Sequence, residues 1–241
     1  IASCKKEFMK YDILAFGAHP DDVELGCGGT IAKSLGQNKK VAIIDLTRGE
    51  LGTRGSVDIR NNESSKANKI LGINFRENLD FKDGFFKNDK KHQLIVISKI
   101  REFKPDIVLC NSSEDRHIDH GKGSSLVNDS CFLSGLEKIE TFDINNIKQE
   151  IWRPKIVLEY IQWNEIKPDF IFDISGYLKI KLDAVKAYSS QLFNSNSSES
   201  ETPISSQNFI ESVSYRAKNM GRYFIKKRSR EPFKYDSKPM E

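Results

Sequence analysis

The sequence predicts an α/β protein with a mostly parallel sheet that carries helices on both faces. Short apolar runs bounded by polar residues are typical of buried strands. Between these runs lie longer segments with helical patterns, each long enough for the crossover helix that joins two parallel strands. A chain of 241 residues can also bury one sizeable core. We therefore expect a single domain over residues 9–241, preceded by an N-terminal extension over residues 1–8.

Strands and helices are expected to alternate along the chain. The predicted strands are 11–17, 41–47, 106–112, 155–161 and 169–175. The predicted helices are 28–37, 58–72, 92–103, 121–136, 175–192 and 206–224. A Ser- and Asn-rich loop separates the last two helices, and no internal repeat interrupts the pattern. In such open parallel sheets, ligands bind beyond the carboxyl ends of the strands.

Composition and charge exclude several classes of partner. The sequence is 38% hydrophobic and 30% charged, as in ordinary globular proteins, and no run reaches the roughly 18 apolar residues of a membrane span. The net charge is only +4, and basic residues gather in one segment, "GRYFIKKRSREPFK". Such a run is more often a solvated face than a nucleic-acid site. We expect neither a membrane span nor a nucleic-acid partner.

The cysteines bear on the compartment. Cys4, Cys27, Cys110 and Cys131 form no C-x-x-C pair and show no disulfide-like spacing, which favours a reducing, cytoplasmic location. One alternative is that "IASC" is the end of a bacterial lipoprotein signal with Cys4 as the acylated residue. Against it, Met9 opens "MKYDILAFG", a natural start for a first strand.

The stretch "AHPDDVELGCGG" follows the first predicted strand and sets His19, Asp21 and Asp22 into one loop. Adjacent aspartates repel each other, so the pair is stable mainly where a cation or hydrogen-bond donors compensate it. A dinucleotide site is excluded because its glycines should begin at the strand end, and two carboxylates there would repel a pyrophosphate. The loop is therefore a candidate cation site.

A second cluster, "DRHIDH", follows the strand predicted over 106–112 and contains His117 and His120. Both clusters leave parallel strands at the same edge, so they are expected to meet. We predict a divalent metal held by His19, Asp22 and His120, a donor set that suits catalytic zinc and also accepts iron(II). Taken singly, each of these residues is more often a satisfied histidine or a helix cap than a ligand; the prediction depends on their combination.

The remaining residues of the two clusters suit acid–base roles. Asp21 would be the general base that takes a proton from the attacking water. His117 would be a charged imidazolium that stabilises an oxyanion and protonates a leaving amine, with Asp119 hydrogen-bonded to it.

The motifs "AHPDDVELGCGGTIA", "LTRGELGTRG", "IRNNE", "DRHIDH" and "QWNEIKPDFIFDIS" resemble the LmbE-like (PIG-L-type) zinc-dependent N-acetylglucosamine deacetylase family, from about Met9 to Tyr223. More narrowly, they resemble its bacillithiol-biosynthesis branch. The resemblance implies a Rossmann-like three-layer fold, often in a homo-oligomer, that hydrolyses the acetamide of N-acetylglucosaminyl-malate. It implies the same ligands, base and charged histidine as above, and it places Arg60 in the sugar pocket.

Three positions depart from the family pattern. Ile118 stands where the family usually has a proline, and Phe209 stands where some relatives carry a tyrosine hydroxyl. The segment "RSREPF" stands where relatives have the stretch Tyr-Ala-Glu-Gly-Phe after the last helix. The role of this segment, in the C-terminal wall of the substrate pocket or in an oligomer contact, is therefore open.

Two other functions remain open from the sequence. The enzyme could deacetylate another N-acetyl sugar conjugate, because the pocket for the aglycone is the least readable part. The chain could also be a non-catalytic sugar-binding module of the same fold that uses Arg60 and the basic segment.

Overall fold

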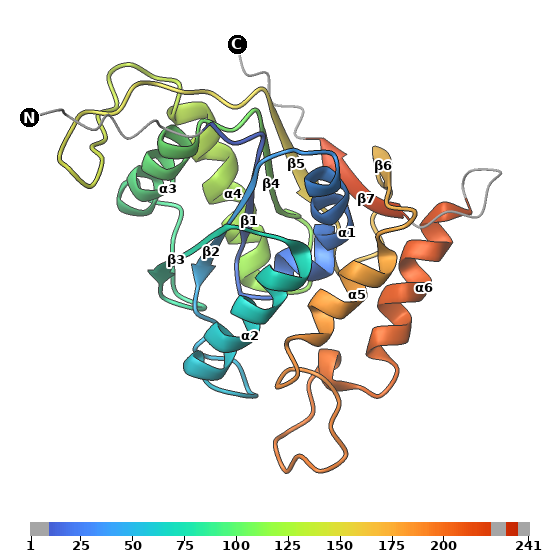
Figure 1. Cartoon of the computed structure of the whole chain (residues 1–241). Helices are drawn as coiled ribbons and strands as arrows, with labels where there is room; N and C mark the ends of the chain where they lie inside the picture. The colour runs from blue at the N-terminus through green and yellow to red at the C-terminus, as the bar shows by residue number, and fades with distance from the viewer. Residues whose placement is uncertain (1–9, 223–229, 236–241) are drawn as a thin grey trace, which may run out of the picture.

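The computed structural model describes residues 10–222 and 230–235. They form a seven-stranded sheet in the order β3-β2-β1-β4-β5-β7-β6, with helices on both faces (Figure 1). The predicted α/β fold class is confirmed. The extension predicted over residues 1–8 lies outside the described residues.

The strands are β1 (Ile13–Gly17), β2 (Val41–Thr47), β3 (Phe75–Phe81), β4 (Ile107–Asn111), β5 (Ile156–Tyr160), β6 (Phe170–Asp173) and β7 (Arg230–Tyr235). The helices are α1 (Asp22–Gly36), α2 (Val57–Leu71), α3 (Lys90–Phe103), α4 (Ile118–Leu133), α5 (Leu178–Lys186) and α6 (Phe209–Gly221), with a short 3-10 helix over Pro203–Ser205. All five predicted strands and all six predicted helices have counterparts among these elements.

Alternate residues of the strands supply two separate cores. Ile13 and Ala15 of β1 pack with α1, α2 and α5 on one face of the sheet. Leu14 and Phe16 of the same strand pack with α3 and α4 on the other face. Successive side chains of a strand point to opposite faces, so a strand that is apolar throughout must be covered on both sides. This explains why the predicted strands are continuous apolar runs.

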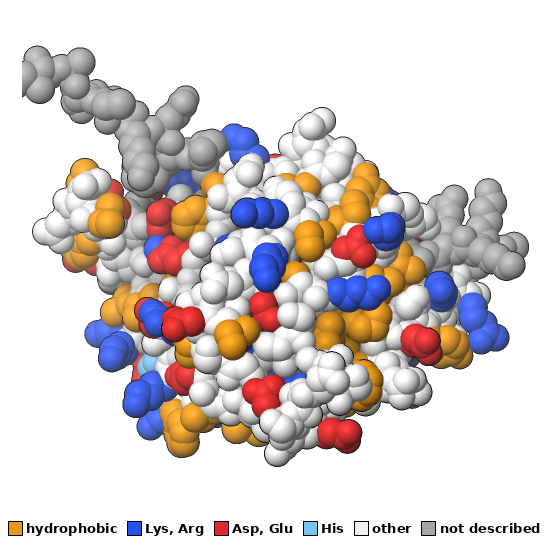
Figure 2. Space-filling view, turned by 60° about the horizontal axis from the view of Figure 1, so that its bottom comes forward, with side chains coloured by type: hydrophobic (Ala, Val, Ile, Leu, Met, Phe, Trp, Pro, Cys, Tyr) orange, Lys and Arg blue, Asp and Glu red, His pale blue; other side chains and the backbone are white. Residues whose placement is uncertain are grey.

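The direction of the strands gathers the loops that carry the polar motifs. Strands β1 to β5 pair in parallel, so the segments that follow them leave the sheet at one edge. This edge lies at the bottom of Figure 1. Figure 2 brings it forward and shows acidic side chains near the middle of the face, with hydrophobic side chains gathered to the right, where α5 and α6 lie.

Two strands were not predicted, and both have sequences that conceal a strand. β3, "FRENLDF", is half-buried at the edge of the sheet and carries Arg76, which donates to Asp45 at 2.7 and 2.8 Å. β7, "REPFKY", contains charges and a proline, yet it pairs antiparallel with both β5 and β6. The "RSREPF" segment, whose role was open from the sequence, thus contributes part of a strand.

Glu231 of β7 binds the backbone of helix α1 where the helix is interrupted. Cys27 has non-helical dihedral angles, so the backbone N–H groups just after it lose their usual acceptors within the helix. Glu231 is 1% exposed and accepts from the N–H groups of Gly29 at 2.9 Å and Thr30 at 2.6 Å. Lys181 of α5 balances its charge at 2.5 Å. The three segments are therefore locked together by one buried carboxylate.

No helix among the described residues is long and apolar enough to cross a membrane. Half of the basic segment near the C-terminus, residues 223–229, lies outside the described residues, as does Cys4. Cys27, Cys110 and Cys131 are buried and form no disulfide.

Lys181→Met is expected to destabilise the fold by about 3 kcal/mol, because removing one partner of a buried ion pair leaves the other charge uncompensated. Lys179→Met is the matched control on the same helix, where an exposed i,i+4 pair with Asp183 contributes about 0.5 kcal/mol or less. Urea unfolding of both variants measures the difference. Equal midpoints would show that the buried pair adds no stability.

Candidate metal centre

His19 and Asp22 lie at the junction of β1 and α1. The chain turns sharply after Gly17, and Asp22 is the first residue of the helix. An Asp22 oxygen accepts from the backbone N–H of His19 at 2.9 Å and lies 3.4 Å from its Nδ1. The helix start thus holds one carboxylate against one imidazole.

His120 arrives from β4 and completes the predicted set. It lies in the first turn of α4, and its Nε2 is 3.1 Å from the second oxygen of Asp22. All three side chains are buried, at 8%, 2% and 5% exposure for His19, Asp22 and His120. The structure therefore brings together the three residues predicted to bind metal, with the carboxylate shared between two imidazoles.

The far nitrogen of each imidazole also lies beside a carboxylate. Nε2 of His19 is 3.0 Å from Asp83, which in turn accepts from the N–H of Leu51 at 2.9 Å. Nδ1 of His120 is 3.1 Å from Asp115, although the two groups are not aligned for a hydrogen bond. Metal-binding histidines commonly present their second nitrogen to a carboxylate, which fixes the tautomer and orientation of the ring.

This arrangement suits a divalent metal. Two imidazole nitrogens and a carboxylate converge, and each ring has a carboxylate behind it, so the donor set fits zinc or iron(II). Donor atoms that lie within 4.8 Å of one another are offered by His19, His117 and His120, and by His19, Asp83 and Asp119; the predicted ligand Asp22 belongs to neither set. The same cluster thus offers more than one set of three donors.

The charges of the cluster explain its pKa shifts. Burial lowers the pKa of His19, but hydrogen bonds to Asp119, Asp22 and Asp83 outweigh it and raise the pKa well above the usual value. For His120 the carboxylates likewise outweigh burial and raise the pKa to about 9. The same two imidazoles hold the pKa of Asp22 well below its usual range, against burial. Because ligating imidazoles are neutral, metal binding must release protons from this cluster.

His117 is the N-cap of α4 and lies beside the rings of His19 and His120. Its ring packs edge-on against His19 at 4.6 Å, and its Nδ1 accepts from the N–H of Asp119 at 3.3 Å. Burial lowers its pKa, and the positive charges of His19 and His120 lower it further. Sequence reasoning expected a histidine held in its charged form, so the direction of this shift differs from the expectation. Ile118, the departure from the family pattern, is an exposed first residue of α4.

The hydrogen bonds of the Asp119 side chain go to residues other than His117, the residue that we expected Asp119 to orient. The fully buried carboxylate of Asp119 accepts from the N–H of Gly84 at 2.6 Å and from Lys122 at 3.1 Å, and lies 3.6 Å from Nε2 of His19. The reason is the geometry of the helix start: the N-cap ring folds over the backbone N–H of Asp119, while the side chain of Asp119 points to the loop after β3. Asp119 therefore supports His19.

Asp21 differs from the neighbouring Asp22 in backbone conformation, hydrogen bonding and pKa. Its φ of 114° lies in the left-handed region, where non-glycine residues are strained, and Asp and Asn are the residues that tolerate it best. The residue is 7% exposed, and its carboxylate makes no hydrogen bond among the described residues. Burial raises its pKa to about 7, opposed by the charge of Arg60 and reinforced by that of Asp22. A carboxylate with this pKa suits a general base near neutral pH.

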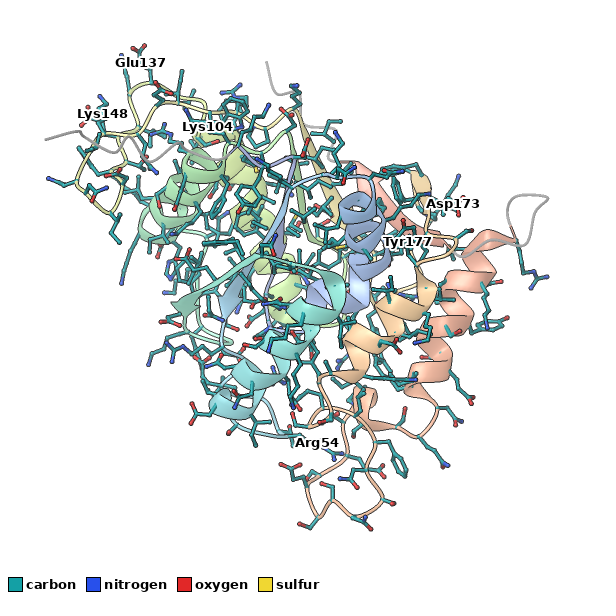
Figure 3. All side chains as sticks on the ribbon, viewed as in Figure 1. Arg54, Lys104, Glu137, Lys148, Asp173 and Tyr177 are labelled. Carbon is teal, nitrogen blue, oxygen red and sulfur yellow. The ribbon has the colours of Figure 1, made fainter. Side chains whose placement is uncertain are left out.

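Arg60 is buried on α2, at 7% exposure, within electrostatic range of Asp21. Its Nη2 donates to Gln191, while its Nε has no partner among the described residues. Gln191 also donates to the backbone carbonyl of Arg54 at 2.7 Å, where the loop after β2 meets the loop after α5 (Figure 3). Gly49 is required beside Arg60, because its φ is +65° and a Cβ would lie 2.0 Å from Nη1.

Four of the side chains that hold this site were missed from the sequence. Asp83, Asp115 and Gln191 contact predicted site residues, and Gln162 donates to Asp22 at 2.9 Å. Asp115 is the first residue of the motif "DRHIDH", so its position near the two histidines in the sequence could have indicated its role. Gln162 is the first residue of the motif "QWNEIKPDFIFDIS", whereas Asp83 and Gln191 lie in loops that no motif marks.

The sequence profile of the GlcNAc-PI de-N-acetylase family (PIG-L) matches residues 14–131. The uncharacterised deacetylase YaiS of Escherichia coli is 46% identical over 115 residues, which are 45% of this chain and 61% of that protein. The diacetylchitobiose deacetylase of Thermococcus kodakarensis is 28% identical over 189 residues, 74% of this chain and 69% of that protein. The chain thus spans about three fifths of the first relative.

A solved structure extends the similarity over nearly the whole chain. The conserved protein TT1542 from Thermus thermophilus superposes with a TM-score of 0.81 at 31% identity, and the match covers 93% of this chain and 94% of that one.

Asp83→Ala is expected to weaken metal binding by about 10- to 100-fold, because the carboxylate behind a ligating histidine fixes its tautomer. Competition with a chromogenic zinc chelator measures the affinity directly. Asp58→Ala, at an exposed position of α2, is the control for the loss of one negative charge. Unchanged zinc affinity in Asp83→Ala would contradict this role.

Asp21→Asn is expected to stabilise the metal-free protein at pH 8 by about 1 kcal/mol or more. The folded pKa of about 7 lies above the ordinary 3.8, so the ionised carboxylate destabilises the fold fully above pH 7 and not at all near pH 4. The gain should therefore shrink as the pH falls from 8 to 4. Urea unfolding with a chelator present, with Asp58→Asn as control, measures it; a pH-independent difference would refute the shift.

Proposed function

Because the chain belongs to the GlcNAc-PI de-N-acetylase (PIG-L) family, we propose that it is a metal-dependent hydrolase that removes an N-acetyl group from a sugar-derived amide. The observation that carries the proposal is that the Asp22 carboxylate lies between two imidazoles. The neighbouring Asp21 has a strained backbone and a carboxylate without a hydrogen bond among the described residues. A binding module has no need of a base at that position. The names of the relatives, deacetylases both, support the same reaction.

His19, Asp22 and His120 would hold the metal, with zinc as the proposed ion. A divalent metal bound at these residues supplies a Lewis acid that lowers the pKa of a water molecule and polarises the amide carbonyl. Asp83, Asp115 and Asp119 keep the two ligating rings in place. These contacts involve neither Asp21 nor His117, which are therefore available to the substrate.

Asp21 and His117 divide the proton transfers. Asp21 takes a proton from water as the water oxygen bonds to the carbonyl carbon. His117 faces the developing oxyanion and donates a proton to the amide nitrogen. The carbon–nitrogen bond then breaks, and the products are acetate and a free amine. Its lowered pKa makes the imidazolium a stronger acid.

Arg60 supplies a polar contact for the rest of the substrate. Its buried Nε lacks a partner, and its fixed fork of donors suits sugar hydroxyls or a carboxylate. We propose N-acetylglucosaminyl-malate, the substrate of bacillithiol biosynthesis, as the specific substrate. Another N-acetyl sugar conjugate is the alternative, since one relative is named for its action on diacetylchitobiose.

The direct test is release of acetate by the purified protein. N-acetylglucosamine, its malate conjugate and diacetylchitobiose form the substrate panel, each with and without a chelator. We expect fastest hydrolysis of the malate conjugate, and loss of activity on chelation that added zinc restores. No acetate from any member, in zinc-loaded protein, would exclude the proposed reaction.

The neighbouring aspartates should fail differently when each is replaced by asparagine. Asp22→Asn is expected to weaken metal binding about 10-fold or more, and excess zinc should partly restore its activity. Asp21→Asn is expected to keep its metal and lose about 10²- to 10⁴-fold in turnover, which zinc does not restore. Metal content by atomic absorption, together with acetate release, separates the two. The opposite pattern would exchange their roles.

A further inference from the structure

The loop between β5 and β6, residues 161–169, reaches two carboxylates of the candidate metal centre. The side-chain amide of Gln162 donates to Asp22 at 2.9 Å. The backbone N–H of Trp163 donates to Asp115 at 3.2 Å. Asp22 is a proposed metal ligand, and Asp115 supports another ligand from behind. Both hydrogen bonds therefore depend on the path that the backbone of this loop takes.

Helix α6 fixes the path of this loop through Arg216. Residues 161–169 form neither helix nor strand, so regular secondary structure does not satisfy their backbone groups. The guanidinium of Arg216 donates to three consecutive backbone carbonyls, those of Gln162, Trp163 and Asn164. Such carbonyls would otherwise hydrogen bond with water, and an irregular surface loop would be free to move. One planar group with several fixed donors thus holds three peptide units.

The burial of Arg216 is compensated by the loop and not by an ion pair. The side chain is half-buried, and it forms no salt bridge with a carboxylate in the part of the chain that the structure describes. Burial lowers the pKa of its guanidinium, and the more distant charges of Glu165 and Asp115 oppose this shift only in part. Since a charge that loses water must find other partners, the three carbonyls are the groups that compensate Arg216.

The ring of Trp163 gives the loop a second attachment to α6. The ring of Phe209, the first residue of α6, stacks on it at 6.2 Å with an interplanar angle of 19°. The guanidinium of Arg116, which precedes His117 in the sequence, lies 4.6 Å from the centre of the Trp163 ring. Phe209 is the position where some relatives carry a tyrosine, and here its ring contacts the loop. Helix α6 therefore holds the loop through both Arg216 and Phe209.

We propose that Arg216 is a positioning residue for the metal centre: it holds the loop where Gln162 can orient the carboxylate of Asp22. The inference rests on the proposed function, in which Asp22 is a metal ligand. Removing a hydrogen-bond partner of a ligating group typically weakens metal binding by about 10- to 100-fold. The positive charge of Arg216 acts in the opposite direction, because it repels a second cation. Loss of position and loss of charge therefore change zinc affinity with opposite signs.

Zinc affinity, measured by competition with a chromogenic chelator, tests the inference without hydrolysis. Arg216→Met is expected to bind zinc about 10-fold more weakly than the wild-type protein. Arg216→Lys should also bind zinc more weakly, because an ammonium group keeps the charge but lacks the planar fork of donors. Equal or tighter binding in Arg216→Met would overturn the inference. Arg216→Lys decides in the same way if the methionine variant does not fold.

Arg101→Met is the matched control. Arg101 of α3 is 2% exposed and also donates to backbone carbonyls of a loop, those of Ser134, Leu136 and Ile139. This loop contains Glu137 and lies at the top of Figure 3, away from the edge that carries the metal centre. Both variants leave buried carbonyls without donors, so urea unfolding should show that both are destabilised. Only Arg216→Met should lose zinc affinity; an equal loss in Arg101→Met would overturn the inference.

A double variant tests whether Arg216 acts through Gln162. Gln162→Leu removes the donor to Asp22 and is expected to weaken zinc binding about 10-fold. Adding Arg216→Met to Gln162→Leu should then cost less affinity than Arg216→Met alone, because the two residues act on the same ligand. Full additivity of the two losses would overturn the action through Gln162. Wild-type protein that binds zinc and releases no acetate would refute the proposed function and leave the role of Arg216 standing.

Discussion

The carboxylate of Asp22 is the group on which the rest of the site depends. It is buried, and a buried charge is stable only where opposite charges and hydrogen bonds surround it. His19, His120 and Gln162 meet that requirement from three different segments of the chain. Each imidazole in turn brings a further carboxylate behind it, so the network grows outward from one helix start until it reaches the loops after β2 and β3. Compensation of one charge thereby organises the whole edge of the sheet.

Much of this arrangement could be predicted from the sequence, because strand order makes distant motifs neighbours. His19 and His120 each follow an apolar run, and parallel pairing of β1 with β4 brings the two together. The fold class follows from the same alternation. β3 was not predicted because it is a half-buried edge strand with charged side chains. β7 was not predicted because its charges and its proline interrupt the apolar pattern on which strand prediction depends.

The contacts behind the ligands could not be predicted for a different reason. Asp83 reaches His19 across 64 residues, and Gln191 reaches Arg60 across 131, through loops whose paths the local sequence does not specify. The orientation of Asp119 is also a tertiary property: whether its carboxylate turns to His117 or His19 depends on where the loop after β3 places Gly84. Residue type predicted a charged network, and only the three-dimensional contacts assign its members.

The carboxylate of Glu231 has a consequence for how the protein is made. It binds the backbone of Gly29, which lies 202 residues earlier in the chain. The ribosome releases the amino-terminal part of a protein first, and domains fold as their segments emerge. Here helix α1, which begins at Asp22, leaves the ribosome long before the partner for its broken turn, which is synthesised 202 residues after Gly29. A nascent chain that stalls before β7 therefore carries His19 and Asp22 at the start of a helix whose interruption has no partner, while His120 already lies on α4. The centre rests on an anchored α1 only once β7 has been synthesised.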